Sequence, residues 1–431
     1  MSEAYEPPRA PKQMRDRFSF LLIVGVTFGL QFLTLITGVI IARLLGVEGR
    51  GIIALVLALG MFASQLTFGA SLPNALAKAL AERQIAARDG FGRIARRRGV
   101  LLVLPCLTAA AFMLFLQRSG AGPQKYLLAA AVFVMALQTM LFRILAGGLQ
   151  GEGRLVRMAL AGLAPQLLFT VVLTTAALQR WDWQALDVLL AYFVTGTLGL
   201  AFAFSSLLRP SRRAEDQLDE TPLWAESRRM YVSSVRPLDG LALDRIAVGG
   251  LLGTAPLGLY TAALAVSNLC SLVSNAVAVI VLPRVAMHGA DRTAQRAVIR
   301  RWVSLSAGLI VLLVVVLQIL VDPIIRTAFG EEFAGGIECA RWLIVADGLM
   351  ALRKVLIAVL QGEGRGGTAS WIELTLLPMM MAGIAVAAAQ ESLPGIGMSL
   401  AAVGALSCLS LGWVVGRRDA VPRAGQGIPA P

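Results

Sequence analysis

Charged side chains that interrupt otherwise apolar stretches are the residues of this sequence best placed to do chemistry. The most charged of these stretches contains Arg236, Asp239, Asp244 and Arg245. A charge near the centre of a lipid bilayer costs about 2.5–3.5 kcal/mol on insertion scales, so such side chains should face protein or water. At about 100° per residue, the first three fall within an arc of roughly 140° on a continuous helix, and Arg245 points nearly the opposite way. We expect the first three to line an aqueous cavity, and the alternative is that these charges only pair with one another.

Two further cations occupy matching positions in a sequence repeat. The hexapeptide Leu-Gln-Gly-Glu-Gly-Arg occurs at residues 149–154 and again at 360–365, about 211 residues later. Arg143 precedes the glutamine of the first copy by about two helical turns, and Lys354 precedes that of the second copy equally. Asp347 shares the helix face of Lys354. One cation in each copy suits an anion held between the two copies, and the alternative is that both cations extend to the membrane surface.

Arg43 and the carboxylates complete the set of candidates. Arg43 ends the first apolar stretch, where it either contributes to an anion site or extends outward. Glu373 lies more than one turn inside its expected helix and is available to titrate or to pair with Lys354. The candidates for ion or proton coupling are Asp239, Asp244, Asp347 and Glu373, with plain ion pairing as the alternative for each.

The sequence predicts neither an enzyme nor a metal site. Its only histidine, His288, lies in a basic loop, and its four cysteines have no metal-ligand or disulfide spacing. No pattern supplies a nucleophile together with its base, so we expect no catalytic residue. A membrane enzyme that joins sugars is a further alternative, but it requires a large outer loop and the expected outer loops are short. We expect no cofactor beyond a coupling ion, H+ or Na+.

The elements that carry these residues are apolar helices. Of the 431 residues, 57% are hydrophobic and 15% are charged, which excludes an ordinary soluble protein. Residues 18–42, 51–77, 246–283 and 392–416 contain no charge, and a membrane-spanning helix needs about 20 apolar residues. The net charge of +13 is explained by Arg-rich cytoplasmic loops, which lack the aromatic residues of nucleic-acid-binding surfaces. We predict an all-α polytopic membrane protein that binds no nucleic acid.

The sequence predicts twelve transmembrane helices, six in each half. They cover residues 18–43, 52–80, 99–117, 126–149, 156–179, 188–208, 231–252, 257–282, 302–321, 339–360, 368–389 and 393–415. An N-terminal half at 18–208 and a C-terminal half at 231–416 are joined by a linker at 209–230 and flanked by tails at 1–17 and 417–431. Alternate loops collect about 27 Arg or Lys on one side and about seven on the other, so both termini and the linker are expected in the cytoplasm. Because each half has an even number of helices, the halves are parallel repeats with the substrate path between them.

Short motifs along nearly the whole chain carry a resemblance to a known family. They are Ala-Arg-Leu-Leu-Gly at 42–46 with Gly51, Leu-Asp-Arg-Ile at 243–246, Leu-Leu-Gly at 251–253, Leu-Gly-Leu-Tyr at 257–260 with Ala262 and Ala263, Leu-Pro-Arg at 282–284, and Phe-Gly-Glu-Glu-Phe at 329–333. In these motifs the chain resembles the polysaccharide transporters, which are flippases for polyprenyl-diphosphate-linked oligosaccharides. Their superfamily also holds multidrug and toxin extrusion pumps and lipid II flippases. Lipid II flippases typically have fourteen helices and a first-helix signature that is not evident here, which argues against lipid II as the substrate.

The resemblance implies a V-shaped pair of six-helix lobes that opens alternately to each side of the bacterial inner membrane. It implies a lipid-linked glycan as substrate, for O-antigen of lipopolysaccharide, capsule or exopolysaccharide, with membrane lipids, a polysaccharide polymerase and export machinery as further partners. A sugar diphosphate cannot cross hydrocarbon, so it requires a hydrated cationic cavity. The residues expected to bind the diphosphate are Arg43, Arg143, Arg236, Arg245 and Lys354, since Arg presents a fork of donors that matches phosphate. The alternative is a cation-coupled multidrug antiporter, which needs an acidic cavity.

Overall fold

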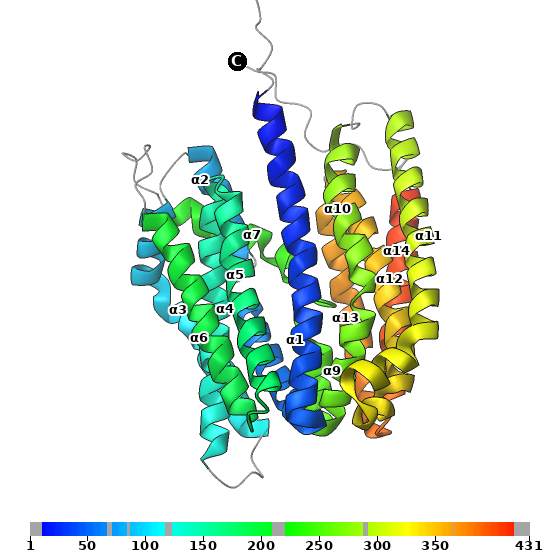
Figure 1. Cartoon of the computed structure of the whole chain (residues 1–431). Helices are drawn as coiled ribbons and strands as arrows, with labels where there is room; N and C mark the ends of the chain where they lie inside the picture. Colours follow the sequence, from blue (N-terminus) through cyan, green and yellow to red (C-terminus); the bar gives the residue numbers. More distant parts are fainter. Residues whose placement is uncertain are drawn as a thin grey trace, which may run out of the picture.

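The computed structural model describes residues 11–66, 71–83, 87–116, 123–208, 220–287, 292–363 and 365–417, and every regular element in these ranges is helical (Figure 1). The N-terminal half contains α1 (Pro11–Ser64), α2 (Ser71–Arg83), α3 (Ala87–Leu116), α4 (Gln124–Gly151), α5 (Leu155–Leu178) and α6 (Ala185–Leu208). The C-terminal half contains α7 (Glu220–Val235), α8 (Leu243–Leu251), α9 (Thr254–Ser267), α10 (Cys270–Met287), α11 (Arg292–Ile324), η2 (Ile325–Phe329), η3 (Glu331–Gly336), α12 (Ile337–Gly362), α13 (Gly366–Ala389) and α14 (Leu393–Gly416). The prediction of an all-α membrane protein is confirmed.

The expected count of twelve helices is not confirmed, because some expected helices merge and others break. Within the described ranges there are fourteen α-helices, of which seven are long and apolar enough to cross a membrane, or eight if α9 and α10 form one span bent by 51°. The first two expected helices are continuous as α1 across a kink at Gly46. The expected helix at 231–252 is interrupted between α7 and α8, and α7 begins inside the expected linker.

The interruption at 236–242 overturns one expectation about the charges. Arg236 and Ala242 both have positive φ, at 42° and 51°, so the chain leaves the helix at one and re-enters it at the other. Pro237 lies between them, and the residue before a proline is disfavoured in helical geometry. The arc predicted for Arg236, Asp239 and Asp244 was wrong, because it assumed a continuous helix.

The sequence repeat is reproduced as repeated geometry. Gly46 and Gly253, which end the two Leu-Leu-Gly motifs, have φ of 66° and 99° with extended ψ of −168° and −178°. Only glycine adopts this conformation at low cost, so both turns depend on it. In the two hexapeptide copies, the backbone N–H of Arg154 donates to the Leu149 carbonyl and that of Arg365 to the Leu360 carbonyl, each at 2.8 Å. The two halves therefore share local structure as well as sequence.

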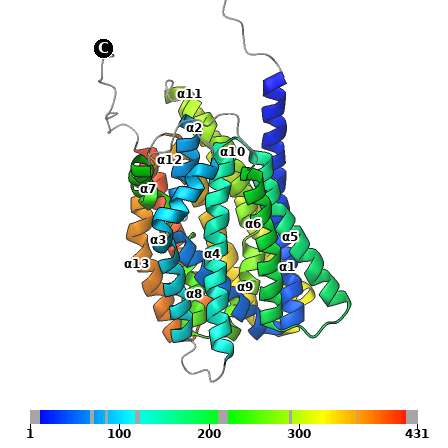
Figure 2. The same ribbon diagram turned by 90° about the vertical axis from the view of Figure 1, so that its left-hand side faces the viewer.

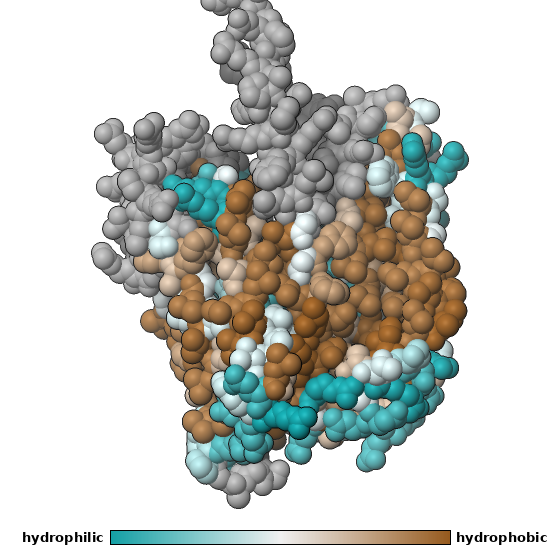
Figure 3. Space-filling view, viewed as in Figure 1, coloured by the Kyte–Doolittle hydropathy of each residue, from teal (hydrophilic) through white to brown (hydrophobic). Residues whose placement is uncertain are grey.

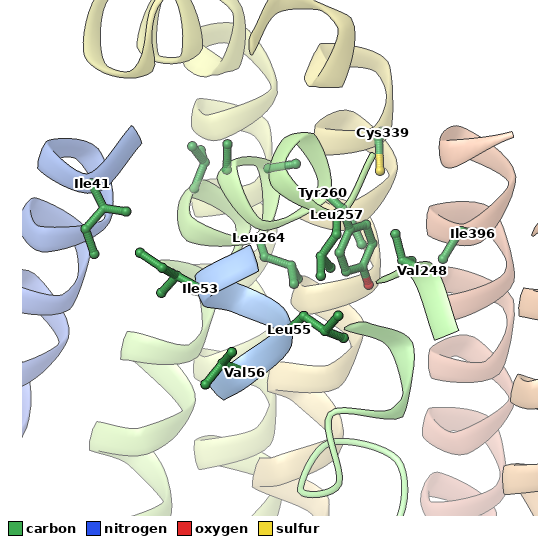
Figure 4. Packing of buried hydrophobic residues seen from close by; sticks show 14 of the residues in the cluster. Ile41, Ile53, Leu55, Val56, Val248, Leu257, Tyr260, Leu264, Cys339 and Ile396 are labelled. Atoms are coloured by element: carbon green, nitrogen blue, oxygen red, sulfur yellow. The ribbon is translucent and has the colours of Figure 1, made fainter. Parts of the chain in front are cut away.

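The helices form two groups with α1 between them. Figure 1 shows α2–α6 on one side of α1 and α9–α14 on the other, and the view turned by 90° places α3, α4 and α6 toward the reader (Figure 2). A hydrophobic band crosses the middle of the molecule, and hydrophilic residues gather at its lower edge (Figure 3). The largest buried cluster connects the groups at the lower end of α1, where Ile53 and Leu55 meet Leu257 and Tyr260 of α9 (Figure 4).

Two glycines allow the halves to touch where α1 crosses α9. A Cβ atom added at Gly51 would lie 1.8 Å from the Thr254 carbonyl oxygen, and one added at Gly258 would lie 1.9 Å from the Val47 carbonyl oxygen. Gly51 and Gly258 follow Gly46 and Gly253 at the same spacing, so this crossing pairs equivalent positions of the two repeats. The halves are thus closed against each other at the end opposite the start of α1 and the end of α14 (Figure 1).

Candidate functional site

A cavity of about 300 Å³ lies between the two halves, next to the closed end. It is lined by the parts of α1 before and after the kink at Gly46, and by α5, α6, α8 and α9. Its polar lining residues are Thr34, Thr37, Arg50, Gln166, Tyr192, Arg245, Thr261 and Asn268. Among the described residues, the lining contains two guanidinium groups and no carboxylate, so the cavity is cationic.

Arg50 is the more deeply buried of these two cations. Its side chain is 6% exposed, donates to the backbone carbonyls of Gly38 and of Thr261 (3.0 Å), and lies 5.0 Å from the centre of the Phe329 ring. Its Nε is buried without a hydrogen-bond partner in the described chain. Carbonyl groups satisfy part of its donors but leave its positive charge without a counter-ion among the described residues, which favours an anion in the cavity.

Arg245 reaches the same cavity from α8. Its Nε is also buried without a hydrogen-bond partner among the described residues. Arg50 comes from α1 and Arg245 from α8, so the two cations belong to different halves. An anion between them would contact both halves at once.

A second cavity, of about 530 Å³, adjoins the first. The two share Thr34, Ala265 and Asn268 in their linings. The second is lined mainly by apolar groups of α1 and of the junction between α9 and α10, and its lining includes Phe32, which is 63% exposed. A chamber that contains two cations therefore continues into a passage between α1 and α10 that is lined mainly by apolar groups.

A cluster of ions around the buried Arg353 forms the other charged feature, and it belongs to the C-terminal half. Arg353 of α12 is fully buried and pairs with Glu373 of α13 at 2.7 Å and with Asp239 at 3.1 Å. Lys354 lies 3.7 Å from the same Asp239 carboxylate. Asp239 is located in the interruption between α7 and α8, so the break carries its carboxylate to Arg353.

The other carboxylates predicted from the sequence accept hydrogen bonds from hydroxyl groups. The Tyr260 hydroxyl donates to Asp244 at 2.7 Å, and the Ser267 hydroxyl donates to Asp347 at 2.5 Å. Both donors belong to α9, so these bonds hold α9 against α8 and α12.

The remaining predicted cations lie apart from one another. Arg43 is at the closed end, where it donates to the carbonyls of Thr327 (2.5 Å) and Ala328 (2.9 Å). Arg236 is exposed beside the helix interruption. Arg143 is partly buried on α4 and makes no ion pair within the described chain. Of the five cations expected at the diphosphate, Arg245 is the one that lines the 300 Å³ cavity between the halves, which we call the central cavity.

Sequence reasoning missed Arg50 and the role of Arg353. Arg50 follows the glycine turn closely and was taken as part of a loop, although it lies within helical α1. Glu373 pairs with Arg353 and not with Lys354, the partner considered from the sequence. Comparing the two repeats position by position would have singled out Arg353, because its equivalent in the first repeat is the apolar Phe142. His288 lies outside the described residues, and the described ranges contain no group of His, Cys, Asp and Glu able to hold a metal ion.

Comparisons with known proteins agree with this architecture. The sequence model of a family described as polysaccharide biosynthesis protein matches residues 229–338, which include Asp239, Asp244 and Arg245. A search of curated proteins gives no significant match. Among solved structures, the lipid II flippase MurJ in an inward closed conformation superposes with a TM-score of 0.72 at 12% identity, over 92% of this chain and 87% of the flippase.

Two other solved structures are similar over nearly their whole length. A multidrug resistance MATE family transporter in an inward-facing conformation gives a TM-score of 0.62 at 14% identity, over 90% of this chain and 94% of that one. A MOP superfamily transporter from Pyrococcus furiosus gives 0.58 at 16% identity, over 94% and 96%. The chain therefore has the fold of MOP superfamily transporters, which confirms the resemblance predicted from its short motifs.

Proposed function

We propose that the protein is a flippase that moves a polyprenyl-diphosphate-linked oligosaccharide from the cytoplasmic to the outer leaflet of a bacterial inner membrane. The observation that carries this proposal is the pairing of the two cavities. A chamber whose described lining has two cations and no carboxylate suits a diphosphate headgroup, and the adjoining passage, lined mainly by apolar groups, suits a polyprenyl chain. The family matched by residues 229–338 takes part in polysaccharide biosynthesis, which favours a glycan on the diphosphate.

In this mechanism the headgroup enters between the halves while its lipid tail stays in the bilayer. Arg50 and Arg245 bind the diphosphate near the closed end, and Arg143, Arg236 and Lys354 attract it along the path. Arg43 holds the closed end instead of the substrate, because its Nε and one of its Nη groups already donate to Ala328 and Thr327. Opening that end would require breaking these bonds and the contact where α1 crosses α9.

The proposed function also implies an orientation in the membrane, partners and a coupling ion for the transporter. Both termini lie in the cytoplasm, as the distribution of basic loops predicts. The product in the outer leaflet would pass to a polysaccharide polymerase and export machinery, for O-antigen, capsule or exopolysaccharide. The carboxylates Asp239, Asp244, Asp347 and Glu373 are the groups through which H+ or Na+ would drive the cycle.

The test is made in a strain that lacks this protein. Lipid-linked sugars are extracted after treating cells with a reagent that modifies only outward-facing glycans. We expect intact lipid-linked oligosaccharide to remain unmodified, because it is trapped on the cytoplasmic face. Returning the wild-type protein to this strain should restore modification of the glycan. The Arg245→Gln variant should restore little modification, whereas Arg301→Gln, at an exposed residue of α11, should restore full modification. Normal modification in the strain without the protein would overturn the proposal.

A second candidate is a cation-coupled multidrug antiporter of the same fold. The observation that favours it is the pair of carboxylates that meets at Arg353, the exposed Asp239 and the buried Glu373, together with the structural likeness to a MATE family transporter. Against it, Arg353 and Lys354 together already balance these two carboxylates, and the cavity between the halves is cationic. Dye efflux by the purified protein in vesicles that is lost in Asp347→Asn or Glu373→Gln would support this function.

A further inference from the structure

A third cavity lies on the far side of the C-terminal half, away from the proposed substrate path. It has a volume of about 840 Å³ and is enclosed by α11, α12 and α14. No described residue lines both this cavity and either of the two cavities between the halves. Figure 1 shows α11 at the outer edge of the molecule, and side chains along this helix, including Leu309, Leu312 and Val316, are exposed as expected for contact with lipid tails. We name this cavity the outer groove.

The lining of the outer groove changes from polar to apolar along the helices. Thr293, Arg296, Arg300 and Ser304 follow one another on the same face of α11. The rest of the lining is apolar or small, and it comprises Ala297, Ile299, Val303, Ala307, Leu352, Leu356, Cys408, Gly412, Val415 and Gly416. One end of the groove is therefore cationic, and the remainder resembles hydrocarbon.

The length of α11 places the cationic end at the level of lipid headgroups. The helix has 33 residues and is about 50 Å long, whereas the bilayer core is about 30 Å thick. The stretch from residue 302 to 321 carries no charge and is long enough to cross that core alone. Arg296 and Arg300 precede this stretch, so they lie in the interfacial region on the side where α14 ends (Figure 1).

Within the described chain, the outer groove has a charge without an ion-pair partner and a space that no side chain fills. Arg300 is exposed and makes no ion pair with any described residue. A Cβ atom added at Gly412 or at Gly416 would meet no atom of the described chain within 4 Å, so these glycines leave the floor of the groove hollow. In a bilayer such a space is filled by an acyl chain, and two arginines at its mouth select a phosphate.

We propose that the outer groove binds one anionic glycerophospholipid of the leaflet near the chain termini, with its phosphate at Arg296 and Arg300 and one acyl chain along Gly412. The bound lipid would fill the space between α11 and α14. The site is separate from the substrate path, so it does not depend on the flippase function.

The test is native mass spectrometry of the full-length protein in detergent with either anionic phosphatidylglycerol or zwitterionic phosphatidylcholine, which has no net charge. A cation near the membrane surface contributes roughly fivefold in affinity for an anionic lipid, so wild type should bind one phosphatidylglycerol at least about tenfold more tightly than phosphatidylcholine. Arg300→Gln should lower this preference about fivefold. Arg301→Gln removes the same charge from the neighbouring residue, which does not line the groove, and should change it less than twofold.

A second variant tests the apolar part of the groove. Gly412→Leu should fill the space and abolish the tight phosphatidylglycerol site, and its melting temperature reports whether the protein folds. Equal loss of preference in Arg300→Gln and Arg301→Gln would mean that surface charge alone attracts the lipid, and the proposal would be wrong. It would also be wrong if folded Gly412→Leu kept the tight site.

Discussion

The N-terminal half packs Phe142 against Gly162 at positions where the C-terminal half pairs Arg353 with Glu373. These positions correspond because Phe142 and Arg353 lie at the same sequence distance before their copies of the hexapeptide. Gly162 and Glu373 likewise lie at the same sequence distance after their copies. A Cβ atom added at Gly162 would lie 3.6 Å from the tip of the Phe142 ring, and Arg353 lies 2.7 Å from Glu373. The same contact between two helices is therefore apolar in one half and ionic in the other.

The first helix of each half differs in the same sense. In the N-terminal half α1 is continuous up to Gly46, whereas in the C-terminal half the corresponding segment is interrupted between α7 and α8. The interruption delivers Asp239 to Arg353, and the N-terminal half has the apolar Phe32 at the position equivalent to Asp239. Duplication has kept the fold of the two halves but not their chemistry. The C-terminal half is the one in which charges couple a broken helix to the helices around it.

The largest effect should follow from removing the cation of this cluster. Arg353→Leu leaves Glu373 buried without its partner, and breaking a buried pair in this way costs about 3–5 kcal/mol. Thermal unfolding of the purified protein in detergent should show a large fall in melting temperature. Lys354→Leu is the matched control, because Lys354 is 28% exposed and 3.7 Å from Asp239, so its loss should cost less than about 1 kcal/mol.

Replacing the ionic pair of the C-terminal half by the apolar pair of the N-terminal half tests this comparison further. The double variant Arg353→Phe with Glu373→Gly should recover much of the stability lost in Arg353→Phe alone, since Lys354 remains to balance Asp239. If the ion cluster is needed for the transport cycle, this double variant should be folded but inactive in the glycan-labelling assay. Full transport by the double variant would mean that the cluster only stabilises the fold.

A smaller effect is expected where the two halves are alike. Gly51→Ala and Gly258→Ala each place a methyl group against a backbone carbonyl of the other half, so each should destabilise the closed end by about 1–3 kcal/mol. The two losses should be similar, because the glycines occupy equivalent positions in the crossing. Gly412→Ala is the control, since its added methyl group meets no atom of the described residues and alanine favours a helix. Loss of stability from only one of the two glycine changes would contradict the symmetry of this contact.

These cases show which parts of the fold and site are accessible from the sequence. Hydrophobic length predicted an all-helical membrane protein, and the expected helix ranges left breaks that contain Gly46 and Gly253, because both signals are local. The interruption at 236–242 had a local signal as well, in Pro237, but an apolar segment of spanning length was treated as one helix. Its consequence, the meeting of Asp239 with Arg353, depends on packing between α12 and residues far away in the chain, and periodicity carries no information about it.

The central cavity was equally difficult to predict in detail. Arg245 was named from its depth within an apolar stretch, and the structure places it in the cavity lining. Arg50 was not named, since it directly follows the turn and precedes the uncharged stretch. Its burial arises only when α9 and Phe329 cover it, which is a contact between the two halves. Cations inside a helix are visible in a sequence, but cations buried by assembly of the halves are not.

Transport provides the next test, at the pair of equivalent cations on α4 and α12. Arg143→Gln should reduce outward glycan labelling about tenfold, the effect of losing roughly 1.4 kcal/mol of interaction with a diphosphate. Lys354→Gln should reduce it less, because Asp239 already offsets part of the charge of Lys354. Both variants should keep the wild-type melting temperature within about 2 °C, since neither cation is fully buried. Unchanged labelling in both would remove these residues from the substrate path.

The smallest effect concerns the ends of α5 and α13, where the two halves share a strained residue. Arg180 and Glu391 are exposed and have φ of 53° and 51°, and the following N–H groups of Trp181 and Ser392 donate to carbonyls five residues earlier, at 3.1 and 3.0 Å. This helix ending usually has glycine at the left-handed position, because other residues cost about 1–2 kcal/mol there.

Replacing either residue by glycine removes that strain but increases the freedom of the unfolded chain. Arg180→Gly and Glu391→Gly should therefore each stabilise the protein by only about 0.5 kcal/mol, and by the same amount. The melting temperatures of the two single variants and of the double variant measure this, and the double variant should show the sum because the sites are far apart in the structure. A gain in one half and a loss in the other would show that the two endings, although alike in backbone geometry, are held by different surroundings.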